Sequence, residues 1–104
     1  MNATTTLDNE CLNRVRGWFE ARGYAQVACE RARDGHFLLL CRADSLHLVY
    51  CLPGNPMVST IEVEACAQAR RRWHAQSAAI VAPLRFTAAA RREAQRQHIE
   101  WLAV

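Results

Sequence analysis

Residues 34–52 read DGHFLLLCRADSLHLVYCL. This stretch holds two apolar runs, 37–41 and 46–52, on either side of the polar break 42–45. Each run is too short for a helix and too continuous for a strand with one face in water. The runs therefore predict two adjacent strands, at 36–42 and 46–52, that are buried on both faces of a sheet. We expect the rest of the chain to cover them.

The segments on the N-terminal side predict one helix and one further strand. Apolar side chains recur at helical spacing over 7–22, and Gly23 suits the left-handed position that follows a helix. Residues 24–30 alternate loosely between apolar and polar, which is typical of a strand. Residues 1–6 are polar, and we expect a loose tail there, followed by one domain over 7–104.

The C-terminal half predicts two helices that alternate with two strands. Ser59 and Glu62 have the spacing of a capping box, so a helix begins there. We expect its buried face to be the apolar stripe Val58, Ile61, Ala65, Ala69 and Trp73. The run 78–82 predicts a strand, Thr87 the N-cap of a third helix, and 98–104 a last strand. The predicted fold is α/β, a small mixed sheet flanked by helices in the order αβββαβαβ.

Composition fits a soluble globular domain in a reducing compartment. No apolar run approaches the ~20 residues that span a bilayer, and the N-terminus lacks the regions of a signal peptide, so we expect the cytoplasm. The five cysteines are odd in number and show no C-x-x-C spacing, which favours small buried side chains. A metal site would need Cys41 and Cys51 to face each other, with His36 or His47 beside them, and the spacing does not favour it.

All 13 basic residues are arginines, and they give the chain a net charge of +3. Arginine binds phosphate through a bidentate fork, but its pKa above about 12 makes it a poor proton-transfer group. Two groups of arginines fall on the predicted helices: Arg70, Arg71 and Arg72 on the second, and Arg91 and Arg92 on the third. They predict a weak, salt-dependent DNA-binding surface if they share a side, and a solvated helix face otherwise.

The chain resembles the Mrr-like branch of the restriction-endonuclease-like, PD-(D/E)xK superfamily. The predicted element order is similar to that superfamily's core. Gly23 and Tyr24, followed by Asp34 and Gly35, resemble the succession that follows the first helix of the family. A second set of residues resembles the closing βαβ unit of the family: Ile80, Val81, Phe86, Thr87, Ala90, Ala94, Ile99 and Glu100. The resemblance implies a restriction-endonuclease-like fold over nearly the whole chain.

In that superfamily, carboxylates on adjacent strands hold a divalent cation, usually Mg²⁺, and a lysine positions the attacking water. Carried onto this sequence, the metal-binding aspartate falls on Leu38, the second ligand on Tyr50 and the lysine on Leu52. The glutamate of the first helix falls near Glu10 or Leu12. Because leucine cannot ligate Mg²⁺ and the chain has no lysine, the resemblance implies an inactive nuclease fold, without metal ligands or cofactor.

The favoured interpretation is therefore an inactive domain that binds DNA or a partner protein in DNA restriction or repair. Two alternatives stay open. An active endonuclease would need relocated Mg²⁺ ligands, and the chain offers Asp34, Glu62 and Glu64, although a turn, the capping box and a solvated helical turn explain them more simply. A protein-interaction or homodimerisation module would instead use the aliphatic strands and Trp101 as its interface.

Overall fold

The computed structural model describes residues 3–32, 35–52, 57–82 and 85–102. Its elements follow one another along the chain, and their bounds are α1 (Ala3–Glu20), β1 (Ala25–Arg31), β2 (His36–Arg42), β3 (Ser45–Cys51), β4 (Met57–Val58), α2 (Thr60–Arg72), β5 (Ser77–Val81), β6 (Arg85–Phe86), α3 (Ala88–Arg96) and β7 (Ile99–Leu102). None of the helices in these ranges is both long and apolar enough to cross a membrane.

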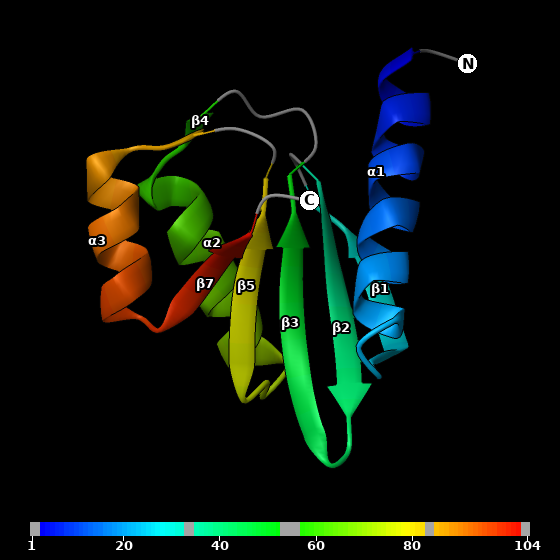
Figure 1. The fold of residues 1–104 in the computed structure, drawn as a ribbon. Helices are drawn as coiled ribbons and strands as arrows, with labels where there is room; N and C mark the ends of the chain where they lie inside the picture. The colour runs from blue at the N-terminus through cyan, green and yellow to red at the C-terminus, as the bar shows by residue number, and fades with distance from the viewer. Residues whose placement is uncertain (1–2, 33–34, 53–56, 83–84, 103–104) are drawn as a thin grey trace.

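Five strands form one mixed sheet in the order β1-β2-β3-β5-β7 (Figure 1). The pairs β1–β2 and β2–β3 are antiparallel, whereas the pairs β3–β5 and β5–β7 are parallel. Parallel neighbours need a crossover, and the crossovers here contain α2 and α3. The short strands β4 and β6 pair with each other in parallel, outside the main sheet.

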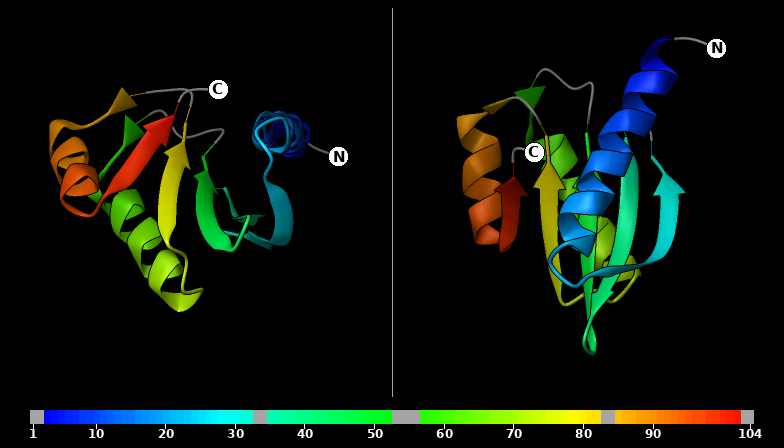
Figure 2. Two further views of the ribbon diagram at one scale, coloured as in Figure 1. Left: turned by 60° about the horizontal axis from the view of Figure 1, so that its bottom comes forward. Right: turned by 45° about the vertical axis from the view of Figure 1, so that its right-hand side comes forward.

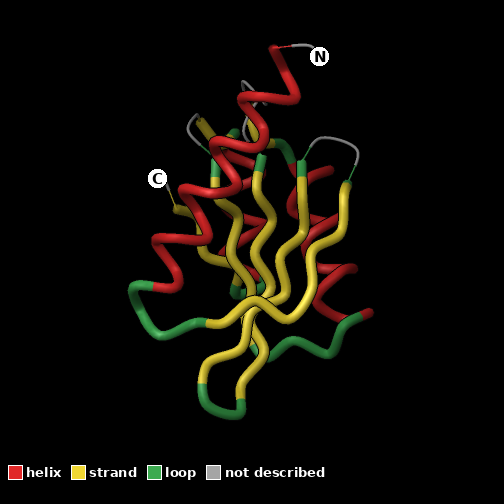
Figure 3. Tube along the Cα trace, turned by 90° about the vertical axis from the view of Figure 1, so that its right-hand side faces the viewer, coloured by secondary structure: helices red, strands yellow, loops and turns green. Residues whose placement is uncertain are grey.

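Helices cover the two faces of the sheet unequally (Figure 2). Helix α1 lies diagonally across the strands on one face (Figure 3), where Leu12, Val15 and Phe19 pack on the sheet. Helices α2 and α3 lie on the other face and bury the larger apolar cluster, including Val63, Cys66, Ala90 and Ala94. The sheet is thus the middle layer of the domain.

The two central strands confirm the prediction from the hairpin sequence. Strand β2 spans the predicted range, and β3 begins and ends one residue earlier than predicted. Leu38 packs toward α1 while Phe37 packs toward α2, and both are buried. The α/β class, the mixed sheet and its flanking helices are as predicted, and β4 and β6 are two short additions to the predicted order.

Two local predictions are wrong. Helix α1 begins at Ala3, so residues 3–6 continue the helix instead of forming a tail. The buried face of α2 is also rotated from the predicted stripe: Ile61 is 75% exposed, whereas Val63 is fully buried and Glu62 is 8% exposed. The rotation arises because the capping box turns Glu62 back onto Ser59, and the side chains of Val63 and Cys66 then meet the sheet.

Candidate functional site

The positions of the expected metal ligands lie in the core of the domain. Leu38, Tyr50 and Leu52 are 0%, 3% and 0% exposed. Leu38 faces α1, but Tyr50 and Leu52 face α2 and α3, so the three positions do not meet on one face. The residue that faces Tyr50 across the hairpin is Phe37, whereas Leu38 faces Val49.

Aromatic rings fill the space on the α2 side of these strands. The ring of Phe37 stacks on that of Tyr50, with centroids 4.3 Å apart, and Trp73 meets Phe37 edge-on at 6.3 Å. Cys66 lies in the same cluster, and burial raises the pKa of its thiol to about 12, so it stays neutral. These contacts make a dry, uncharged layer that cannot hold a hydrated divalent cation.

The backbone closes the end of the same strands. A Cβ atom on Gly35 would overlap the carbonyl oxygen of Cys51, so the chain before β2 touches the end of β3 directly. Only glycine permits this approach. The strand ends at which an endonuclease of this fold would hold its ion are therefore occupied by backbone and apolar side chains.

The relocated carboxylates are not brought together. Glu62 accepts hydrogen bonds from the backbone N–H and the hydroxyl of Ser59, at 2.7 and 2.9 Å. Glu64 pairs with Arg71 at 3.4 Å and accepts from the Gln97 amide at 3.2 Å. Residues two apart on a helix point in different directions. Asp34 lies outside the described residues.

The hairpin also separates the cysteines of the alternative metal site. Cys41 pairs with Leu46, whereas Cys51 pairs with His36, so the two cysteines lie at opposite ends of the hairpin. Across the described ranges, no group of three histidine, cysteine, aspartate or glutamate side chains could hold a metal ion. The cysteine hypothesis is therefore wrong because the strand register separates its two thiols.

Arg72 and Arg91, one from each predicted group of arginines, lie at opposite edges of the sheet. Arg72 forms an ion pair with Glu30 of β1 at 2.8 Å, whereas the Arg91 guanidinium lies over the Trp101 ring of β7 at 4.9 Å. Because β1 and β7 are the two edges of the sheet, these side chains lie on opposite sides of the domain. Arg70 is also engaged, since it donates to the backbone carbonyl of Gln97 at 2.9 Å.

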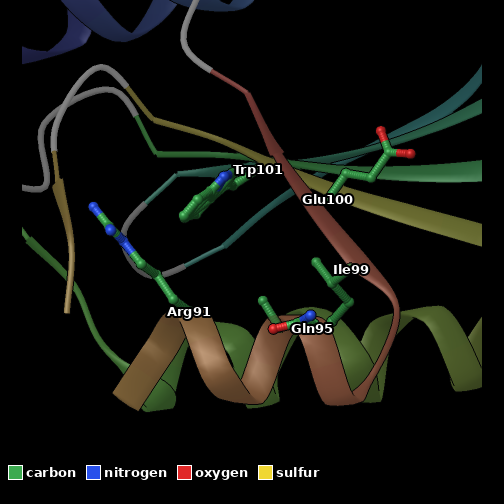
Figure 4. A pocket seen from close by; sticks show the side chains of 6 residues that line it. Arg91, Gln95, Ile99, Glu100 and Trp101 are labelled. Atoms are coloured by element: carbon green, nitrogen blue, oxygen red, sulfur yellow. The ribbon is translucent and has the colours of Figure 1, made fainter. Parts of the chain in front are cut away.

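A hollow that sequence reasoning missed lies between α3 and β7 (Figure 4). It is about 540 Å³ in volume, and Arg91, Ala94, Gln95, Ile99, Glu100 and Trp101 line it. We call it the β7 groove. Trp101 packs edge-on against Phe86 at 4.8 Å and is 40% exposed. The helical spacing of 91, 94 and 95 was the one available signal for the α3 wall.

A sequence model of the family described as NACHT-associated inactive Restriction Endonuclease 1 matches residues 12–104. The chain belongs to this family. The match to the NACHT-associated inactive restriction endonucleases confirms the prediction of a degenerate restriction-endonuclease-like domain.

A solved structure, that of EndoMS in apo form, has the same fold. It aligns with a TM-score of 0.64 at 14% identity, over 90% of this chain and 45% of the EndoMS chain. The inactive endonuclease thus spans less than half the length of that protein, and the likeness concerns the fold alone. No curated protein matches the sequence.

Proposed function

We propose that this chain is a non-catalytic restriction-endonuclease-like domain that binds a protein partner in association with a NACHT-containing protein. The observation that carries the proposal is the Phe37 ring stacked on Tyr50, one of the expected ligand positions, because a hydrolase needs charge stabilisation there and this layer supplies none. The description of the family as NACHT-associated and inactive supports both halves of the proposal. Its placement in the Mrr branch and its role in restriction or repair stay predictions.

The outer surface supports a protein partner. Trp101 keeps a large apolar ring in water at the edge of the sheet, and tryptophan is enriched at the centres of protein interfaces. Ile61 on α2 is also exposed. Neither side chain belongs to the two buried apolar clusters that form the core.

DNA binding is the second candidate, and the exposed side chains of Arg71 and Arg92 favour it. The split arrangement of the other arginines limits the number of phosphates that one duplex could contact. With about two or three such contacts, the affinity should fall with salt at a slope of roughly −2 to −3 in log–log terms. We therefore expect a band shift, if one occurs, at low salt only.

Co-elution with a purified NACHT-containing protein from the same organism tests the proposal. The chain and that protein are mixed at micromolar concentration and run on a size-exclusion column, with a 30-base-pair duplex in a parallel run. We expect the chain to move to the elution volume of the protein and not to that of the duplex. Separate elution from the protein, together with co-elution with DNA, would replace the first candidate by the second.

Plasmid nicking and calorimetry test the active alternative. We expect no nicking with Mg²⁺ or Mn²⁺, and no heat of metal binding at millimolar concentration. Glu62→Gln is the informative variant, because a relocated site requires this carboxylate. Metal-dependent nicking that disappears in Glu62→Gln, while the variant stays folded by circular dichroism, would restore the active endonuclease.

A further inference from the structure

The two edges of the sheet differ in how well they are protected from added strands. On β1 the register shifts between Gln26 and Ala28, which indicates a bulge, and Gln26 accepts a hydrogen bond from Arg16 of α1 at 2.6 Å. Bulges and covering side chains discourage pairing at an edge. The other edge, β7, keeps continuous pairing with β5 from Ile99 to Leu102 and has no bulge in this range.

Strand β7 presents unpaired backbone groups along the β7 groove. The Leu102 carbonyl accepts a hydrogen bond from the Ala82 N–H at 3.1 Å, so the backbone of Leu102 points inward. Backbone N–H and C=O groups point to alternate sides along a strand, and those of Trp101 therefore point to the open edge. In the part of the chain that the structure describes, β5 is the one neighbour of β7 in the sheet.

The charges beside this edge differ between the two faces of the sheet. Arg91 stands on the α3 side, over the ring of Trp101, whereas Glu100 points away from both (Figure 4). Glu100 pairs with Ala79 and so lies on the α1 side of the sheet. An added strand would meet a cation on one face and an anion on the other.

We propose that the β7 groove binds an extended segment of a partner protein as an added strand, with an acidic side chain toward Arg91 and a basic one toward Glu100. Successive side chains of a strand point to opposite faces, so adjacent acidic and basic residues satisfy both positions. Apolar side chains on the acidic face enter the groove against Ile99 and Ala94. The segment is the partner contact of the proposed function, on which this inference rests.

A second copy of the chain fits this edge poorly. A two-fold dimer through antiparallel β7 strands pairs residues on the same face of the sheet. One register brings the two Glu100 side chains opposite each other, and the next brings the two Arg91–Trp101 stacks together. Like charges directly opposite each other destabilise a strand pair.

Two peptides of identical composition test the proposal. The probe acetyl-Val-Lys-Glu-Thr-Val-Thr-amide places its acidic and apolar side chains on one face and its lysine on the other. The control acetyl-Val-Glu-Lys-Thr-Val-Thr-amide exchanges the two charges. In titrations followed by ¹H–¹⁵N NMR, we expect the probe to shift the amides of 99–102 and to bind about three- to tenfold more tightly than the control. Hydrogen exchange of the Trp101 backbone amide should slow with the probe.

Two variants test whether Arg91 causes the preference for the probe over the control peptide. Arg91→Glu should abolish the preference for the probe, whereas Arg92→Glu, which makes the same charge change at an exposed neighbour outside the groove, should keep it. Equal affinity for both peptides, equal effects of the two variants, or unchanged exchange at Trp101 overturns the proposal. So does concentration-dependent broadening of β7 without peptide, which indicates a second copy, or displacement of the probe by an oligothymidine.

Binding of the NACHT-containing protein and binding of the probe can fail independently of each other. If the NACHT-containing protein binds wild type and Arg91→Glu equally well, the protein partner stands and the groove is not its contact. If that protein does not bind but the probe binds with the expected selectivity, strand addition at the β7 groove is supported and the association with a NACHT-containing protein is rejected.

Discussion

The rings of Phe37 and Tyr50 stack across the β2–β3 hairpin with their planes 28° apart. Both are almost fully buried, and Tyr50 is one of the positions that the family resemblance assigns to a metal ligand. The pair is therefore part of the hydrophobic core.

Phe37→Asp should destabilise the domain by at least about 3–5 kcal/mol, because it removes a buried ring and places a carboxylate in a dry layer. Since domains of this size have total stabilities of about 5–15 kcal/mol, the variant should be close to unfolding in water. Urea unfolding measures the loss. Val27→Asp makes the same charge change at a 57% exposed position and should cost about 0.5 kcal/mol or less. Equal losses in the two variants would contradict the structural role of the stack.

Gly35→Ala should destabilise the domain by about 2–4 kcal/mol, because the added Cβ overlaps the carbonyl oxygen of Cys51 and the backbone must shift. Gly17→Ala is the matched control. Gly17 lies within α1 and a Cβ there meets nothing within 4 Å, so the substitution should stabilise by about 0.5–1 kcal/mol. Thermal melts of both variants measure these changes. If the two variants shifted the melting temperature in the same direction, the backbone at Gly35 would not lie tightly against the carbonyl of Cys51.

The stability of the domain should fall with acid because of His47. This imidazole hydrogen-bonds the Ser77 hydroxyl and packs against the rings of Phe19 and Tyr24. Burial lowers the pKa of His47, with Glu100 opposing the shift and Arg42 adding to it. The unfolded chain therefore binds the proton more readily. The contribution is fully present above about pH 6.5 and is lost as the pH falls below this value toward the lowered pKa.

The free energy of unfolding between pH 7.5 and pH 5 measures this effect. The slope should approach, at most, about 1.4 kcal/mol per pH unit, and His47→Gln should flatten it. His98→Asn removes an exposed histidine and keeps a residue that tolerates the positive φ of 56° found there. This control should retain the wild-type slope. A slope that is the same in His47→Gln as in wild type would assign the acid sensitivity to other groups.

Ser59→Ala should cost about 1 kcal/mol, because it removes the side chain that accepts from the Ile61 N–H and donates to Glu62. Ser45→Ala, at an exposed position at the start of β3, should cost less than about 0.5 kcal/mol. Guanidinium unfolding compares the two. If Ser59→Ala proved neutral, Glu62 would no longer be explained by the capping box, and its role as a relocated ligand would need new consideration.

The sequence by itself determined the elements whose signals are local. The apolar runs fixed β2 and β3, because a strand of that length buried on both faces shows in adjacent residues. Ser59 and Thr87 were identified as N-caps, and both caps are confirmed, because a cap depends on atoms within one turn of the helix. That leucine at positions 38 and 52 cannot ligate Mg²⁺ also follows from side-chain chemistry alone.

Only the tertiary structure decided which side chains face each other. The strand register made Phe37, and not Leu38, the neighbour of Tyr50, because one residue along a strand reverses the face. The packing of α2 and α3 places Arg72 beside β1 and Arg91 beside β7, so these two arginines of the predicted basic surface lie far apart. The β7 groove likewise forms only because α3 packs beside β7 in the folded domain. No local sequence pattern specifies which residues of different elements become neighbours, because this is set by how the helices pack on the sheet.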